Sequence, residues 1–189
     1  MAMPLLESRR WTADDVRALP DDRNRYECID GELLVTPSPS YDHHHVVAAF
    51  VRVLDRYVMP LQSLDVIWSP SDVEIEPGTL VQPDLFVAIS RRPGRRIRDW
   101  REIAGLMLAI EVLSPSTARV DRGRKRMFYQ RAGVGEYWIV DPDARLVERW
   151  RPRDERPEVI RESLEWQPEG TTEPLKIDLP SLFAAALDD

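Results

Sequence analysis

The chain of 189 residues has the length of one domain, and 43% of its residues are hydrophobic, which is enough for a sizeable core. A single cysteine, Cys28, excludes an intramolecular disulfide framework and sites built from several cysteines. No apolar run approaches the ~20 residues of a membrane span, and the first residues lack the apolar core of a secretory signal. We therefore expect a soluble cytoplasmic protein without membrane attachment.

The net charge of −7 is concentrated toward the C-terminal end of the sequence. Residues 154–189 contain ten acidic and three basic residues, whereas residues 1–153 contain 23 of each. We expect a domain over residues 1–153 and an acidic extension over residues 154–189 that packs on it. Within the neutral part, the stretch from Arg91 to Arg101 is rich in arginine. It predicts a surface that binds nucleic-acid phosphates. The alternative is that these arginines pair with the acidic extension or with a second subunit. The stretch contains Arg91, Arg92, Arg95, Arg96, Arg98 and Arg101.

Hydrophobic periodicity and turn residues predict the elements in chain order. They are a short helix over 12–19, a β-hairpin over 26–35, an amphipathic helix over 43–59, strands over 66–68, 72–76, 85–89 and 106–113, a helix over 119–132, and strands over 136–140 and 146–150. The acidic extension is typical of peripheral strand and loop, ending in a short helix over 182–187. This order predicts a mixed β-sheet flanked by helices, in the α/β or α+β class, with an N-terminal β-hairpin.

Two carboxylates are candidates for a metal site. Glu111 lies within a nearly continuous apolar strand, where a carboxylate costs several kcal/mol unless it is paired or bound to a metal. Asp84 begins the preceding strand, so both carboxylates lie near one end of the sheet if the strands pair. Two oxygen ligands on neighbouring strands suit Mg²⁺. The arginine-rich stretch lies between these two strands in the sequence, so we expect its ends to lie near the same site. The alternatives are a structural salt bridge from Glu111 to an arginine, and a strand-starting turn at Asp84.

A third candidate element is the helix over 119–132. Asp121, Lys125 and Tyr129 recur every four residues, so their side chains project from one face of this helix. Only two of the 26 basic residues are lysines, Lys125 and Lys176, which suggests a need for a compact ammonium group at position 125, with chance as the alternative. The face can bring a cation to the two carboxylates. A solvent-exposed pair between Asp121 and Lys125 is the alternative.

Several motifs occur in a fixed order between Arg9 and Pro152. They are Tyr26–Leu33, Ser38-Pro39-Ser40 with His43, Pro83-Asp84, Glu111–Thr117, Asp121-Arg122-Gly123 with Lys125 and Tyr129, Gly133-Val134, and Glu136–Pro142. In this order they resemble the Uma-two family of restriction-endonuclease-like proteins. The resemblance implies the PD-(D/E)XK nuclease fold, with a metal site at the sheet edge.

The resemblance also assigns roles to residues of this chain. Asp84 matches the motif aspartate and Glu111 matches its second acid. The motif lysine would stand two residues after Glu111, where this chain has Leu113, and Lys125 resembles the displaced lysine of parts of this superfamily. Accessory positions implied by the family or by spacing are Glu27, Glu32, His43, Asp121 and Tyr129.

These observations predict an endonuclease that depends on Mg²⁺ or Mn²⁺ and hydrolyses phosphodiester bonds of nucleic acid, with DNA as the favoured substrate. Asp84, Glu111 and the backbone carbonyl of Val112 would hold the metal, while Lys125 would position a water molecule or stabilise developing charge. Because Leu113 occupies the lysine position, the alternative is a nuclease-like module that binds nucleic acid or a protein without cutting. A homodimer built through the apolar strands near the C-terminal end is compatible with both hypotheses.

Overall fold

A central mixed β-sheet organises the protein. The computed structural model describes residues 9–22, 24–61, 63–92, 94–95, 97–98 and 102–188. The sheet has the strand order β3-β4-β5-β6-β7-β8, in which β5 and β6 run parallel and the other neighbouring strands run antiparallel. Its strands are β3 (Leu64–Trp68), β4 (Leu85–Ser90), β5 (Ile103–Val112), β6 (Glu136–Asp141), β7 (Leu146–Trp150) and β8 (Glu158–Ile160).

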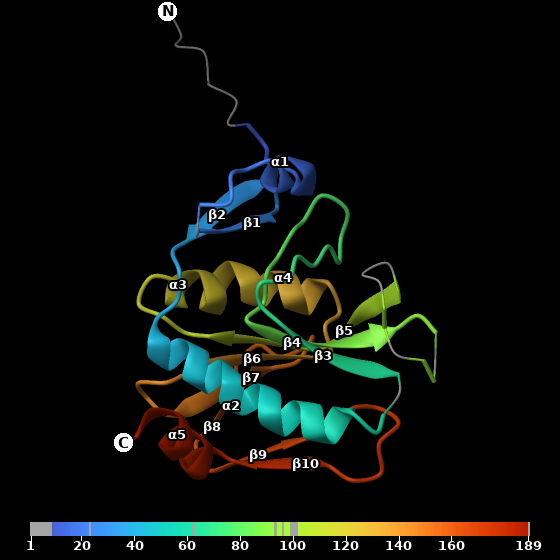
Figure 1. The fold of residues 1–189 in the computed structure, drawn as a ribbon, viewed down its shortest axis with the longest axis vertical. Helices are drawn as coiled ribbons and strands as arrows, with labels where there is room; N and C mark the ends of the chain where they lie inside the picture. The colour runs from blue at the N-terminus through green and yellow to red at the C-terminus, as the bar shows by residue number, and fades with distance from the viewer. Residues whose placement is uncertain are drawn as a thin grey trace, which may run out of the picture.

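Helices cover both faces of the sheet (Figure 1). One face packs against α2 (Tyr41–Val58), and the other packs against a helical segment made of α3 (Ala118–Val120), the π-helical turn η2 (Asp121–Lys125) and α4 (Arg126–Arg131). Because side chains alternate along a strand, Leu85 and Val87 of β4 join the core beneath α2, whereas Phe86 and Ala88 join the core beneath α4. The mixed sheet flanked by helices is thus confirmed.

The long helix α2 begins at a cap and buries one apolar stripe. The side chain of Ser40 accepts a hydrogen bond from the backbone N–H of His43 at 3.3 Å, which satisfies a free donor of the first turn. Val46, Phe50 and Leu54 recur at helical spacing and are fully buried against the sheet. The predicted helix over 43–59 is therefore confirmed, with its start two residues earlier.

The N-terminal hairpin consists of β1 (Arg25–Ile29) and β2 (Glu32–Thr36), and α1 (Ala13–Arg17) packs against β1. Its turn residues Asp30 and Gly31 have φ angles of 55° and 81°, the left-handed conformation that a tight two-residue hairpin turn requires. Backbone hydrogen bonds between Cys28 and Leu80, at 2.7 and 2.9 Å, attach β1 to the rest of the protein. This attachment fixes the position of the β1 side chains relative to the sheet.

The acidic extension contributes to the core. It forms β8 at the sheet edge, then β9 (Ser163–Trp166), β10 (Leu175–Asp178) and α5 (Leu179–Leu187). Leu164, Trp166 and Phe183 are buried in the same hydrophobic cluster as the inner face of α2. Trp166 contacts both Tyr57 of α2 and Trp138 of β6, so this part of the chain packs beside α2 and against the sheet, and Figure 1 shows β9, β10 and α5 next to α2.

The expected strand over residues 72–76 is wrong. This segment pairs only through an isolated bridge between Val73 and Val81, because the rest of its backbone follows turns and bends.

Among the described residues, no helix is long and apolar enough to cross a membrane.

Candidate active site

Asp84 and Glu111 come together where β4 begins and β5 ends. In the antiparallel register Leu85 pairs with Ile110, so the adjoining residues Asp84 and Glu111 lie opposite each other. Strand alternation places Glu111 on the same face as Ala109, which packs toward α4. Both carboxylates are 2% exposed. The sheet thus holds two buried acids side by side, as the sequence predicted.

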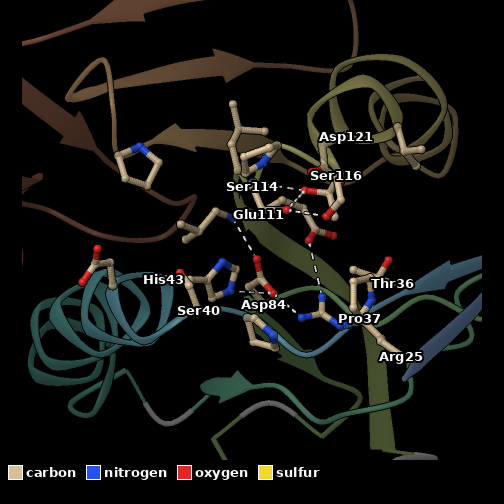
Figure 2. A pocket seen from close by; sticks show the side chains of 18 of the residues that line it. Arg25, Thr36, Pro37, Ser40, His43, Asp84, Glu111, Ser114, Ser116 and Asp121 are labelled. Atoms are coloured by element: carbon tan, nitrogen blue, oxygen red, sulfur yellow. Dashed lines mark hydrogen bonds and ion pairs between the residues drawn. The ribbon is translucent and has the colours of Figure 1, made fainter. Parts of the chain in front are cut away.

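One guanidinium group connects the two acids (Figure 2). Arg25, from the first position of β1, places Nη2 at 2.7 Å from Oδ1 of Asp84 and Nη1 at 3.8 Å from Oε2 of Glu111. The second oxygen of Asp84 accepts a hydrogen bond from the backbone N–H of Val112 at 2.8 Å. His43 approaches Oδ1 of Asp84 with Nε2 at 3.3 Å. A single positive group can therefore reach both carboxylates at once.

Lys125 approaches Glu111 from the helical side. Its Nζ atom lies 2.8 Å from Oε1 of Glu111, 2.7 Å from Oε2 of Glu27 and 3.8 Å from Oδ1 of Asp121. The hydroxyl of Tyr129 donates a hydrogen bond to the same oxygen of Glu111 at 3.2 Å. The predicted helical face thus points inward, so the solvent-exposed alternative for Asp121 and Lys125 is wrong.

The helix widens at this point. The segment Asp121–Lys125 forms a π-helical turn within what the sequence predicts as a regular helix over 119–132. Both end residues of the turn, Asp121 and Lys125, are buried. Single π-helical turns are frequent at functional sites, where the extra backbone length re-aims side chains. Here the turn holds the only buried lysine among the described residues against the acids of the sheet.

The surroundings shift the pKa values of the buried acids in different directions. Burial would raise the pKa of Asp84, but the hydrogen bond from His43 and the charge of Arg25 outweigh it and hold the pKa well below its usual range. Burial raises the pKa of Glu111, and neighbouring carboxylates add to this effect against the opposing charge of Lys125. Burial likewise raises the pKa of Asp121 to about 6, although Lys125 opposes the shift. Of these three acids, Asp84 is therefore the strongest.

The site is open to solvent through a cavity of about 530 Å³. The cavity lies between the start of α2, the hairpin strand β2 and the loop that follows β5. Asp84, Glu111, Lys125 and Asp121 line it, and polar side chains of the loop over residues 114–117 form part of its wall. Figure 2 shows Ser114 and Ser116 on the side of the cavity near Asp121. Molecules in solution can therefore reach the edge of the carboxylate cluster through this cavity.

Carboxylate groups outnumber the cations in the candidate site. Four carboxylates, from Glu27, Asp84, Glu111 and Asp121, face two permanent cations, Arg25 and Lys125. In addition, Oδ1 of Asp121 is buried and has no hydrogen-bond partner among the described residues. In the part of the chain that the structure describes, no three acidic, histidine or cysteine side chains are spaced as a metal site, so a bound ion would rest on the pair Asp84 and Glu111, which supply oxygen ligands of the kind that Mg²⁺ prefers.

Not every predicted site residue joins the cluster. Glu27 contacts Lys125, whereas Glu32, beyond the hairpin turn, pairs with Arg124 at 2.6 Å and is exposed. Leu113 is half-buried and contributes no charge. Sequence reasoning missed Arg25, although its position at the start of the hairpin that carries Glu27 was a usable signal.

The arginine-rich stretch does not lie beside the cluster. It connects the end of β4 to the start of β5, whereas Asp84 and Glu111 occupy the opposite ends of these strands. The six residues of β4 span about 20 Å. The expectation that the ends of this stretch lie near the site is therefore wrong. Arg92, Arg95 and Arg98 line a shallow hollow of their own with Glu102, while Arg96 and Arg101 lie outside the described residues.

Comparisons with known proteins agree with this architecture. A family model named Uma2, described as a putative restriction endonuclease, matches residues 13–186. The chain belongs to the Uma2 family. The crystal structure of a putative nuclease of the DUF820 group from Anabaena variabilis is similar, with a TM-score of 0.76, 26% sequence identity, and coverage of 93% of this chain and 99% of the other. The search of curated proteins finds no match.

The family match gives the buried cluster a context. As a Uma2 protein, the chain has a restriction-endonuclease-like fold, and its acidic cluster lies at the adjoining ends of two inner strands of the mixed sheet. The match extends through the acidic extension as far as α5. Within this Uma2 chain, the ammonium group of Lys125 reaches Glu111 from the helix, although Leu113 occupies the position two residues after Glu111.

Proposed function

We propose that this Uma2 protein is a metal-dependent endonuclease that hydrolyses phosphodiester bonds of DNA, with Mg²⁺ or Mn²⁺ as cofactor. The observation that carries the proposal is the convergence of Asp84, Glu111 and Lys125 at the base of an open cavity. The restriction-endonuclease-like family and fold support the proposal, and the cluster supplies the acid pair and the cation that such chemistry uses.

Asp84, Glu111 and the backbone carbonyl of Val112 would hold the ion. When bound, a divalent cation lowers the pKa of a water molecule and neutralises charge that develops on the phosphate. Arg25 now bridges the two acids, so we expect its guanidinium to turn toward the phosphate when the ion is bound. Lys125 would orient the attacking water or stabilise the developing charge.

A purely structural cluster is the competing interpretation, because buried ion pairs also perturb pKa values. The open cavity favours the functional one, since a structural network has no need of access from outside. The homodimer remains a prediction, and so does phosphate binding by the arginine-rich stretch.

The melting temperature in the presence of Mn²⁺ tests the site. At an ion concentration ten times its Kd, binding stabilises the folded state by about 1.4 kcal/mol, which raises the melting temperature by roughly 3–6 °C for a chain of this size. Asp84→Asn and Glu111→Gln should abolish this shift. Asp143→Asn is the matched control, because Asp143 lies at the exposed rim of the same cavity and outside the cluster. If both cluster variants respond to Mn²⁺ as the wild type does, the ion binds elsewhere.

A further inference from the structure

A second hollow of about 670 Å³ adjoins the candidate active site. Its walls are the side of α2 between His44 and Arg52 and the end of β3 with the following Ser69 and Pro70. Arg25, His43 and Asp84 line both this hollow and the cavity of the active site. The two spaces are therefore adjacent and share a wall formed by these three residues.

Trp68 is the dominant apolar group of this second hollow. It is the last residue of β3 and pairs with Leu85, the residue after Asp84. The next backbone N–H, from Ser69, donates a hydrogen bond to the carbonyl oxygen of Asp84 at 3.0 Å. Because side chains alternate along β3, Trp68 shares a face with Val66, which packs beneath α2. The indole thus lies on the side of the sheet that α2 covers, beside the strand end that carries Asp84.

The exposure of Trp68 matters because of this position. The residue is 52% exposed although it lies between a helix and a strand end. Single exposed hydrophobic residues are common on protein surfaces. This one, however, lines a hollow that begins at a carboxylate of the candidate active site. A flat ligand bound in this hollow can therefore pack against the indole.

The other groups of the hollow complete a site for a nucleotide. Arg52 lies on the exposed side of α2 and makes no ion pair in the part of the chain that the structure describes, so its guanidinium is available to a phosphate or a ring. Asn24 and Gln82 also line the hollow, with the amide nitrogen of Gln82 donating to Asp72 at 2.6 Å, and Val47 and Val51 add apolar surface. An aromatic face, a free cation and amides suit a nucleobase with its phosphate.

We propose that the second hollow binds the base of the nucleotide next to the reacting phosphate, stacked on Trp68. The inference rests on the proposed function, which places that phosphate at Asp84 and Glu111. Inside a duplex, each base is covered on both faces by its neighbours and cannot reach an indole without leaving the stack. The substrate is therefore single-stranded or locally unpaired DNA, and an unpaired base is the feature that this hollow selects.

Binding of a fluorescein-labelled oligothymidylate by the full chain tests the proposal. Ca²⁺ replaces Mg²⁺ so that the strand binds without being cut, and anisotropy gives the Kd for the single strand and for its duplex with oligoadenylate. The wild type should bind the single strand more tightly. Because stacking on an aromatic side chain contributes roughly 1–3 kcal/mol per base, Trp68→Ala should weaken single-strand binding about 5- to 150-fold and leave duplex binding unchanged.

Further variants separate stacking from other effects. Trp68→Phe should retain most of the affinity. Trp68→Leu keeps an apolar side chain without an aromatic face and should lose the affinity. The leucine variant also replaces the alanine variant in the test if the latter does not fold. Val159→Ala is the control, because Val159 is similarly exposed at 54% on the opposite edge strand of the sheet. Arg52→Gln should weaken binding, and Arg56→Gln, one turn further along α2 and outside the hollow, should not.

The possible outcomes distinguish this inference from the proposed function. If Trp68→Ala and Trp68→Leu bind the single strand within twofold of the wild type while the wild type cuts DNA, the base site is wrong and the nuclease function stands. An equal loss for single strand and duplex also overturns the base site. If the wild type binds neither form, the base site and the proposed DNA substrate are both wrong.

Discussion

Replacing Lys125 with methionine would leave a buried group of carboxylates without its nearest cation. The Nζ atom of Lys125 lies within 2.8 Å of both Glu27 and Glu111. Removal of one partner from a buried ion pair costs about 3–5 kcal/mol, because the remaining charge stays out of water. We expect the free energy of unfolding of Lys125→Met to fall by about this amount at pH 8. Lys176→Met is the matched control, because Lys176 is exposed and its pair with Glu165, at 3.0 Å, contributes at most ~1 kcal/mol.

The loss should also depend on pH. Glu111 and Asp121 already have raised pKa values in the folded state, and without Lys125 these values rise further. An acid whose pKa is higher in the folded than in the unfolded state favours folding below its unfolded pKa, and this advantage is lost as the pH rises through the folded pKa. The deficit of Lys125→Met should therefore be smaller near pH 5 than at pH 8. Urea unfolding with EDTA present, followed by tryptophan fluorescence, measures it. Equal losses in the two lysine variants, or a deficit independent of pH, would refute the reasoning.

Two further predictions concern basic residues. Lys125→Arg should lose most nuclease activity, because the planar guanidinium is larger than an ammonium group and cannot occupy the same space between acids, whereas Arg124→Lys and Arg126→Lys should be mild in the same plasmid-cleavage assay. Equal tolerance at all three positions would remove Lys125 from the site. We also replace Arg95, Arg96 and Arg98 of the arginine-rich stretch with glutamine. The magnitude of the salt slope of DNA binding should fall by roughly one for each phosphate that the variant no longer neutralises, while the melting temperature should change little. If DNA binding is unchanged while stability falls or dimerisation weakens, these arginines pair with the acidic extension or with a second subunit instead.

Local sequence patterns were enough to predict the positions of the two carboxylates and of one helical face. Apolar runs and strand-starting residues predicted that Asp84 and Glu111 lie at one end of neighbouring strands, and the register places them opposite each other. The four-residue spacing of Asp121, Lys125 and Tyr129 predicted one helical face, whereas its burial is settled by the packing of the helix against the sheet. The π-helical turn has no such signal, since its residues differ little from those of a regular helix.

Contacts between distant segments could not be predicted in this way. Arg25 reaches Asp84 across 59 residues because the backbone bridge between Cys28 and Leu80 fixes the hairpin on the sheet. The same packing selects Glu27 over Glu32 as the acid that meets Lys125. The distance of the arginine-rich stretch from the candidate site, by contrast, follows from strand direction alone. The stretch connects the end of β4 to the start of its antiparallel neighbour β5, whereas Asp84 and Glu111 lie at the start of β4 and the end of β5.

Cleavage of DNA by the purified chain tests the central claim most directly. The substrates are supercoiled plasmid and circular single-stranded DNA, incubated with Mg²⁺ or Mn²⁺ and, in parallel, with EDTA. The account predicts nicking or linearisation by the wild type that requires the metal, falls to background in Asp84→Asn and Glu111→Gln, and persists in Asp143→Asn. No cleavage of either substrate by the folded wild type, or equal cleavage by wild type and both cluster variants, would contradict it.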